Sequence, residues 1–325
     1  MNTFKWGLLA ILLTITSSCS GLRRMAVGTT SPLFVEAGYE MQTEASWDNF
    51  KLGVLGNLKL MEGMLYVRKS DENLLATLAK GYSGYAFAIN ETQYLKDKLA
   101  ENDKEYHKNL AIMNYSKGLR YGLRWLLEND ISYKQLQKSA GDNLGIEKLL
   151  DSQLGDDTIE LETVLFSAQA LASLINLQKT NLRLVAQLSI AKGMFDWVCK
   201  KRPDINFGTC SIFYGSYEAG RPKMLGGNPQ KGKEIFKKLI AKNPHNWLAR
   251  AAFIEYYIIP MSDEKEYKIQ KLALRKAQVI HNKDLKWSPA SPVKSEVFAA
   301  KEMRFFQALG LKRFQIIRRF EKDIF

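Results

Sequence analysis

Histidine and cysteine are scarce in this sequence, since each occurs three times in 325 residues. His107, His245 and His281 stand far apart and lack the short spacings that usually group metal ligands. No Ser-His-Asp or Cys-His arrangement that could support nucleophilic catalysis can be recognised around them. The sequence therefore predicts no metal site, no cofactor and no enzymatic activity.

Two longer-range patterns are also missing. No stretch shows the convincing alternation of apolar and polar residues that marks a half-buried strand. Beyond the N-terminus, no stretch is expected to be long and apolar enough to cross a membrane. Apolar residues still make up 46% of the chain, which is enough for a sizeable core. These features predict an all-α fold.

The N-terminus has the pattern of an export signal. Lys5 precedes the apolar run WGLLAILLTI at residues 6–15, which is too short to span a bilayer. The small polar residues that follow end at Cys19. This arrangement resembles the lipobox of bacterial lipoproteins, in which the cysteine becomes the acylated N-terminus, although Thr16 stands where Leu is usual.

An ordinary secretory signal cleaved near Ser18 is the alternative, but no A-x-A cleavage site lies nearby. We therefore interpret residues 1–18 as a lipoprotein signal peptide, 19–42 as a tether and linker, and 43–325 as the folded domain. Ser20 after the cysteine resembles sorting signals for the outer membrane. The prediction is a lipid-anchored protein in the cell envelope of a diderm bacterium, facing the periplasm.

The chain is basic, with 47 Lys and Arg against 34 Asp and Glu and a formal net charge of +13. Such a surface suits anionic lipid headgroups or an acidic partner protein. A solvated lysine-rich surface is the simpler interpretation. Nucleic acid is not expected as a partner, because an exported, tethered protein rarely meets it.

If Cys19 is acylated, Cys199 and Cys210 remain as a pair on either side of a turn at Pro203. The periplasm is oxidising, so the two thiols can form a disulfide there. Two unpaired buried thiols are an equally good interpretation, and the sequence does not decide between them.

Helical periodicity runs along most of the chain. Apolar residues recur at helical spacing over 161–175 and 181–199, and Asp157 with Glu160 forms an N-terminal cap signal. Further helices are expected over 43–68, 72–89, 91–101, 105–128, 131–138, 206–219, 229–242, 245–259, 263–280 and 293–323. Many short helices joined by tight turns indicate either a globular bundle or a stack of helical hairpins.

The stretch GNPQKGKE at residues 227–234 begins like a phosphate-binding P-loop. A P-loop needs Ser or Thr after its lysine, whereas Glu234 stands there, and Pro229 removes a backbone N–H. The spacing instead fits the second helix of a tetratricopeptide repeat, whose small and aromatic positions would be Gly232 and Phe236 and whose ending would be Pro244. Asn228 is then the N-cap and Pro229 the first helical residue.

A longer match includes the same residues. The stretch 203–236, with Arg221-Pro222 and Leu225-Gly226-Gly227-Asn228-Pro229, resembles the T-component (TatT) family of TRAP transporters. The segments 74–86, 115–122 and 320–325 are similar to other parts of that family. The Pro-rich segment 287–292 does not match it well, and Gly232 replaces its usual Ala.

The resemblance implies an α-solenoid of tetratricopeptide-like hairpins on a lipid anchor. It also implies a homotrimer with a hydrophobic tunnel in each subunit, and a periplasmic substrate-binding protein of a tripartite ATP-independent uptake system as partner. The ligand implied is a lipid-like small molecule, apolar or amphipathic, such as the fatty acid palmitate.

Aromatic and arginine side chains near the matched segments are the candidates for lining a tunnel, because aromatic rings combine apolar faces with polar tips. They are Tyr82, Tyr85, Tyr115, Arg120, Tyr121, Trp125, Phe213, Tyr214, Tyr217 and Arg221. Each could equally be an ordinary packing aromatic or an arginine paired with a nearby carboxylate.

Two other functions stay open. A generic tetratricopeptide-like scaffold lipoprotein would bind a partner protein or peptide in an open concave face and have no through-going cavity. An enzyme would need a cleft with convergent titratable residues. It is the least favoured of the three, because the paired Asp156 and Asp157 stand at a helix start and look like caps.

Overall fold

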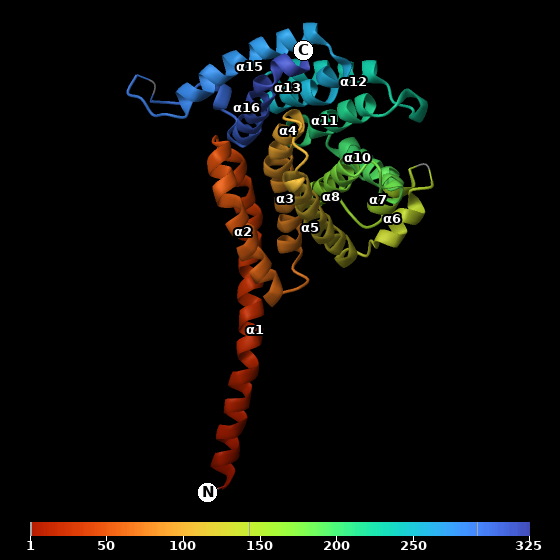
Figure 1. Ribbon diagram of the computed structural model, residues 1–325. Coiled ribbons are helices and arrows are strands. Elements are labelled where there is room, and N and C mark those ends of the chain that lie inside the picture. The colour runs from red at the N-terminus through yellow and green to blue at the C-terminus, as the bar shows by residue number, and fades with distance from the viewer. Residues whose placement is uncertain (1, 143, 291) are drawn as a thin grey trace.

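The computed structural model describes residues 2–142, 144–290 and 292–325, and no β-strand occurs among them (Figure 1). The all-α prediction is thereby confirmed, while the solenoid arrangement stays a prediction. The elements in chain order are α1 (Asn2–Glu40), η1 (Met41–Thr43), α2 (Trp47–Val67), α3 (Glu72–Tyr85), η2 (Ala86–Glu91), α4 (Thr92–Leu99), α5 (Tyr106–Glu128), α6 (Tyr133–Ser139), α7 (Gly145–Asp151), α8 (Thr158–Leu177), α9 (Leu182–Val185), α10 (Leu188–Lys201), α11 (Ile205–Gly220), η3 (Lys223–Leu225), α12 (Pro229–Lys242), α13 (Trp247–Phe253), η4 (Ile254–Ile258), α14 (Ile259–Met261), α15 (Glu264–Asp284), η5 (Glu296–Phe298), η6 (Lys301–Met303), α16 (Arg304–Arg319) and α17 (Glu321–Ile324).

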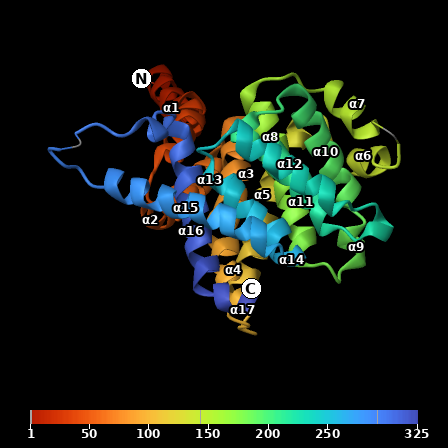
Figure 2. The ribbon, with the colours of Figure 1, turned by 90° about the horizontal axis from the view of Figure 1, so that it is seen from above.

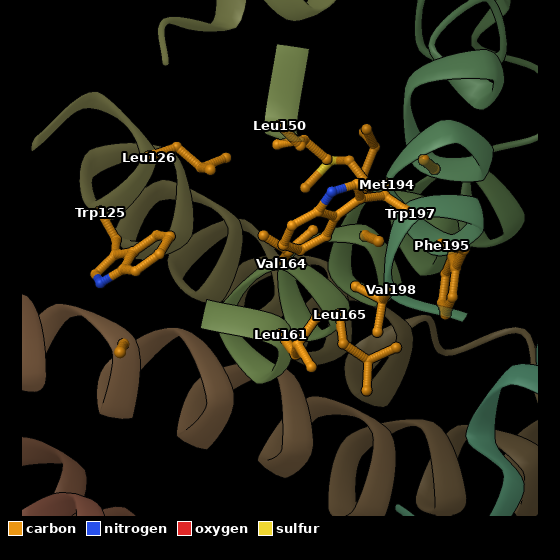
Figure 3. Close-up of a cluster of buried hydrophobic side chains, with 14 of the residues drawn as sticks. Trp125, Leu126, Leu150, Leu161, Val164, Leu165, Met194, Phe195, Trp197 and Val198 are labelled. Atoms are coloured by element: carbon orange, nitrogen blue, oxygen red, sulfur yellow. The ribbon is translucent and has the colours of Figure 1, made fainter. Parts of the chain in front are cut away.

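The first half of the chain packs around α3, α5 and α8, which lie side by side, with α2 and α10 against them (Figures 1 and 2). Its core is a cluster of buried apolar side chains that extends from α2 to α11 and includes Trp125 and Trp197. Figure 3 labels members of this cluster from α5, α7, α8 and α10. Burying side chains of this size stabilises the fold by roughly 1.5–3 kcal/mol each. The helical periodicity over 161–175 and 181–199 thus corresponds to this core.

Helix α8 corrects one expectation from the sequence. Among the described residues, this helix is by length and composition long and apolar enough to cross a membrane. The expectation that no stretch beyond the N-terminus has these properties was therefore wrong. However, 61% of its apolar window is buried inside the molecule, against neighbouring helices that include α3, α5 and α10. A helix that is apolar on nearly every side is typical of the centre of a core as well as of a membrane.

The second half contains the hairpin of α11 and α12 that the repeat motif predicts. The two helices approach closely where glycines face each other, since a Cβ on Gly232 would lie 2.8 Å from the Gly215 carbonyl oxygen. A Cβ on Gly215 would lie 2.7 Å from the ring of Phe236, which is fully buried. The small and aromatic positions of the motif therefore pack against one another.

The turn before α12 explains the sequence that resembles a P-loop. Gly226 has φ +80°, and a Cβ on Gly227 would lie 1.9 Å from the Arg221 carbonyl oxygen. Asn228 then caps α12, because its side chain accepts a hydrogen bond from the Lys231 amide at 3.1 Å. Pro229 is the first helical residue, and Pro244 follows the helix end.

The stretch after Cys19 has a different form from the expected tether and linker. Helix α1 continues to Glu40, and its later part packs on α3, where Asn73 donates a hydrogen bond to Ser31. Val27, Ser31 and Phe34 recur at helical spacing on its packed side. This part of α1 therefore belongs to the folded body. The side chain of Cys19 lies outside the described residues.

Three local features differ from the expected helices. Helix α7 was not expected, and residues 293–303 form a loop with two short 3₁₀ turns, so that α16 begins only at Arg304. The start of α11 is kinked, because Asn206, Phe207 and Gly208 adopt left-handed backbone angles with φ of 47°, 57° and 98°. The first two of these lack the freedom of glycine, which makes the kink a strained segment.

Gly310 provides a test of the packing of α16 on α13. A Cβ there would lie 2.4 Å from backbone atoms of Trp247 and Leu248. We expect Gly310→Ala to lower the free energy of unfolding by about 1–3 kcal/mol, as overpacking does. Gly63→Ala, on an exposed part of α2 with nothing within 4 Å, should raise it by up to about 1 kcal/mol. Urea unfolding measures both, and equal effects would contradict this packing.

Candidate functional site

A cavity of about 1270 Å³ is the main candidate site. Its wall is built by helices from both halves of the chain, from α1 to α16, and apolar side chains predominate in it. Three phenylalanines illustrate how distant segments meet there, with Phe34 on α1, Phe166 on α8 and Phe305 on α16. A concave, largely apolar space of this size is suited to a ligand with a large apolar surface.

Two π-helical turns supply the buried polar part of this wall. Such turns are rare and often occur at functional sites. Turn η2 carries Glu91 and turn η4 carries Glu255 and Tyr256, all three of which line the cavity. Each turn therefore places a carboxylate in a largely apolar surface.

Arg313 of α16 connects the two turns. Its buried guanidinium donates hydrogen bonds of 2.6–2.9 Å to both carboxylate oxygens of Glu255. It also donates to the Thr92 hydroxyl at 3.2 Å and to the Phe87 carbonyl at 3.4 Å. A two-oxygen pairing of this kind holds the carboxylate in a defined orientation as well as neutralising it.

Glu91 is the unusual titratable group of the wall. Burial raises its pKa to about 7, and the charge of Arg313 and a hydrogen bond from Tyr115 only partly oppose that effect. The hydroxyl of Tyr115 has a pKa well above its usual value, first because it is buried and second because of Glu91. Near neutral pH the cavity wall therefore contains a carboxyl group close to half protonation.

The structure brings three of the predicted lining residues to the cavity, namely Phe213, Tyr217 and Arg221. The guanidinium carbon of Arg221 lies 3.8 Å from the centre of the Tyr217 ring, and one of its guanidinium nitrogens lies 3.6 Å from the Glu218 carboxylate. Tyr115 contacts Glu91 and so lies immediately behind the wall.

The other predicted residues have different surroundings and are not among the described residues that line the cavity. Tyr82 is buried in the first core, with Lys117 over its ring, and Tyr121 donates a hydrogen bond to Glu62 at 2.9 Å. The remaining four lie as follows: Tyr85 packs against the core, Trp125 is buried in it, Tyr214 donates to Asp196 at 2.6 Å, and Arg120 is exposed.

A disulfide joins Cys199 at the end of α10 to Cys210 in α11, with 5.8 Å between their Cα atoms. The bond closes a loop that includes the left-handed segment Asn206–Gly208. Since Asn206 and Thr209 line the cavity, the bond also restrains part of its wall.

The sequence interpretation missed Glu91, Glu255 and Arg313. One signal was present in the sequence. Glu91 directly follows the mostly apolar stretch AFAIN at residues 86–90, and Glu255 stands within the mostly apolar stretch AAFIEYYIIP at residues 251–260. A charge in a buried stretch usually has a buried partner. Nothing local, however, indicates that Arg313, more than 200 positions after Glu91, lies beside it.

The raised pKa of Glu91 predicts a pH-dependent stability. Its ordinary value is 4.5, so between pH 4.5 and about 7 the folded chain holds a proton that the unfolded chain has lost. Stability therefore falls as pH rises through this window. We expect Glu91→Gln to be more stable than the wild type at pH 8, by up to about 3 kcal/mol, and nearly equal to it at pH 4.5.

Urea unfolding at the two pH values measures this difference. Glu302→Gln, which neutralises an exposed carboxylate, is the control and should show no such pH-dependent gain. An effect of Glu91→Gln that is the same at both pH values would contradict the raised pKa.

Comparison with known proteins gives the family. No curated protein matches the chain. The family model of the TRAP transporter T-component matches residues 52–302, from within α2 to the 3₁₀ turn η6. The similarity seen at residues 320–325 lies beyond the matched range. This family is a transporter component of the bacterial cell envelope and is not known as an enzyme. Since the match covers well over half of the sequence, the chain belongs to the TRAP transporter T-component family.

Proposed function

We propose that this T-component holds an apolar or amphipathic small molecule in its cavity, as a lipid-anchored part of a TRAP-type uptake system. The observation that carries the proposal is the 1270 Å³ cavity with its predominantly apolar wall. Burial of an apolar chain there would gain about 0.8 kcal/mol for each methylene group removed from water. The ligand would not need a reactive group for binding of this kind.

The position of the cavity favours ligand handling over a generic scaffold. A scaffold would present an open concave face, whereas this space lies between helices of both halves of the chain. Some lining residues are nevertheless exposed, such as Asn57 and Leu60 on α2 and Lys179 after α8. These exposed positions suit entry and exit of a ligand from more than one part of the surface.

The partner in this proposal is a periplasmic substrate-binding protein, and the assembly is a homotrimer. Both belong to the family resemblance and agree with an envelope location. The proposed anchor is a lipid on Cys19. Helix α1 supports it, because Val27 is the earliest of the described side chains that pack on the core, and a lipid eight residues before it would lie about 12 Å away along the helix.

A side chain placed in the cavity tests ligand binding. Gly84 lines the cavity, and a Cβ there meets nothing within 4 Å. We expect Gly84→Trp to occupy part of the space and to abolish co-purification of a small molecule. Native mass spectrometry of residues 20–325 expressed in a periplasm, followed by solvent extraction, measures both the bound ligand and the oligomeric state.

Gly63→Trp, at an exposed position of α2, is the matched control and should keep the ligand. A wild-type protein without any extractable ligand, which also fails to bind added alkyl probes, would argue for the scaffold alternative. A ligand bound equally by the Gly84 variant would place its site outside this cavity.

The lipid anchor is tested by a change at Cys19. We expect the full chain to incorporate radiolabelled palmitate and to fractionate with membranes. Cys19→Ala should lose the label, because only a thiol at this position can be acylated by the lipoprotein route. Cys199→Ser should keep it, and an unlabelled wild type would exclude the anchor without affecting the cavity.

A further inference from the structure

The charged residues that line the cavity are mostly cations. They are Lys80, Glu91, Lys98, Lys108, Lys179, Arg221 and Glu255. Both carboxylates already have protein partners, since Tyr115 donates to Glu91 and Arg313 binds Glu255. The cavity therefore presents more positive than negative charge to whatever enters it.

Three of these cations are also paired within the protein. Lys80 lies 2.8 Å from Glu162, Lys108 binds Glu105, and Arg221 lies beside Glu218. Lys98 and Lys179 differ from them. No described carboxylate lies within 4.0 Å of either ammonium group, although both residues belong to the cavity lining.

These two lysines belong to segments that meet at the same part of the wall. Lys98 is near the end of α4, and Lys179 follows the end of α8. Tyr94 of α4 and Leu177 of α8 pack in one apolar cluster, and both also line the cavity. Since Lys98 and Lys179 themselves are exposed, the pair lies at the rim, beside an apolar interior.

The two charges influence each other. Desolvation first, and the charge of Lys98 second, lower the pKa of Lys179. Neighbouring like charges without a counter-ion are unfavourable, and an anion between them would remove that repulsion. The two lysines at the rim would therefore favour an anionic head group, and the apolar interior would favour an apolar chain.

We propose that Lys98 and Lys179 form an anion-binding site at the rim of the cavity, which selects single-chain amphiphiles with a carboxylate head. This proposal rests on the proposed function, since it assumes that the apolar chain lies in the cavity. It adds that the head group decides between ligands of equal chain length. Neutral lipids and alkylammonium compounds would bind less well than the carboxylate.

Two fluorescent probes with the same chain test the site, namely cis-parinaric acid and its methyl ester. We expect delipidated wild-type protein to bind the acid about tenfold more tightly than the ester, because two partly exposed ion pairs can together contribute the corresponding free energy of about 1.4 kcal/mol. The double variant Lys98→Gln/Lys179→Gln should lose this preference while binding the ester as before. Added salt should weaken only the binding of the acid.

The matched control is Lys238→Gln/Lys276→Gln, which removes the same charge from exposed positions away from the cavity and should keep the preference. Equal affinities of the wild type for acid and ester would overturn the anion site and leave the proposed cavity function intact. The same loss in both double variants would also overturn it, because net charge would then be the cause. Failure of both probes to bind the wild type would instead reject the proposed function and this site with it.

Discussion

The pairing of Arg313 with Glu255 is the interaction on which the rest of the structure depends. A guanidinium that is almost completely buried has lost its water, and the Glu255 carboxylate, the Thr92 hydroxyl and the Phe87 backbone carbonyl accept its hydrogen bonds instead. Removing one partner from such a pair typically costs about 3–5 kcal/mol. Because Arg313 is on α16, the pairing fastens the end of the chain to both π-helical turns.

This constraint also determines the character of the cavity. The π-helical turns direct Glu91, Glu255 and Tyr256 toward the space between the two halves, and α16 holds them from behind. The wall is apolar over most of its area, and its two carboxylates make their hydrogen bonds and ion pairs within the protein. Lys98 and Lys179 lie at the rim, so the proposed ligand would place its apolar chain in the interior and its charged head at the exposed end.

The hairpin of α11 and α12 shows how one local motif serves two parts of the structure. Gly232 and Phe236 provide the close packing of the hairpin, and Gly226 and Gly227 allow the chain to turn beside Arg221. The same turn keeps Arg221 stacked on Tyr217, and both residues line the cavity. The glycine-rich sequence that resembles a nucleotide-binding loop is therefore explained by backbone geometry.

The sequence by itself determined the features that depend on short-range patterns. Helical periodicity and the spacing of Gly232 and Phe236 involve residues three or four positions apart, and the Asn228 cap stands directly before its helix. Most helices could be predicted from such short-range patterns. One exception was the later part of α1, where a tether was expected. The others were short or irregular segments, such as α7 and residues 293–303, where few residues carry the pattern. Family membership followed from several such motifs in order.

Only the tertiary structure decided which side chains surround the cavity. Phe213, Tyr217 and Arg221 line it, whereas Tyr82 and Trp125 are buried in the core and Tyr121 donates to the partly buried Glu62. Helical periodicity shows which side of a helix is buried, but it does not show what packs against that side. The contact of Arg313 with Thr92 spans 221 positions. Contacts over such separations arise from the packing of whole helices, and no local pattern in a single sequence specifies them.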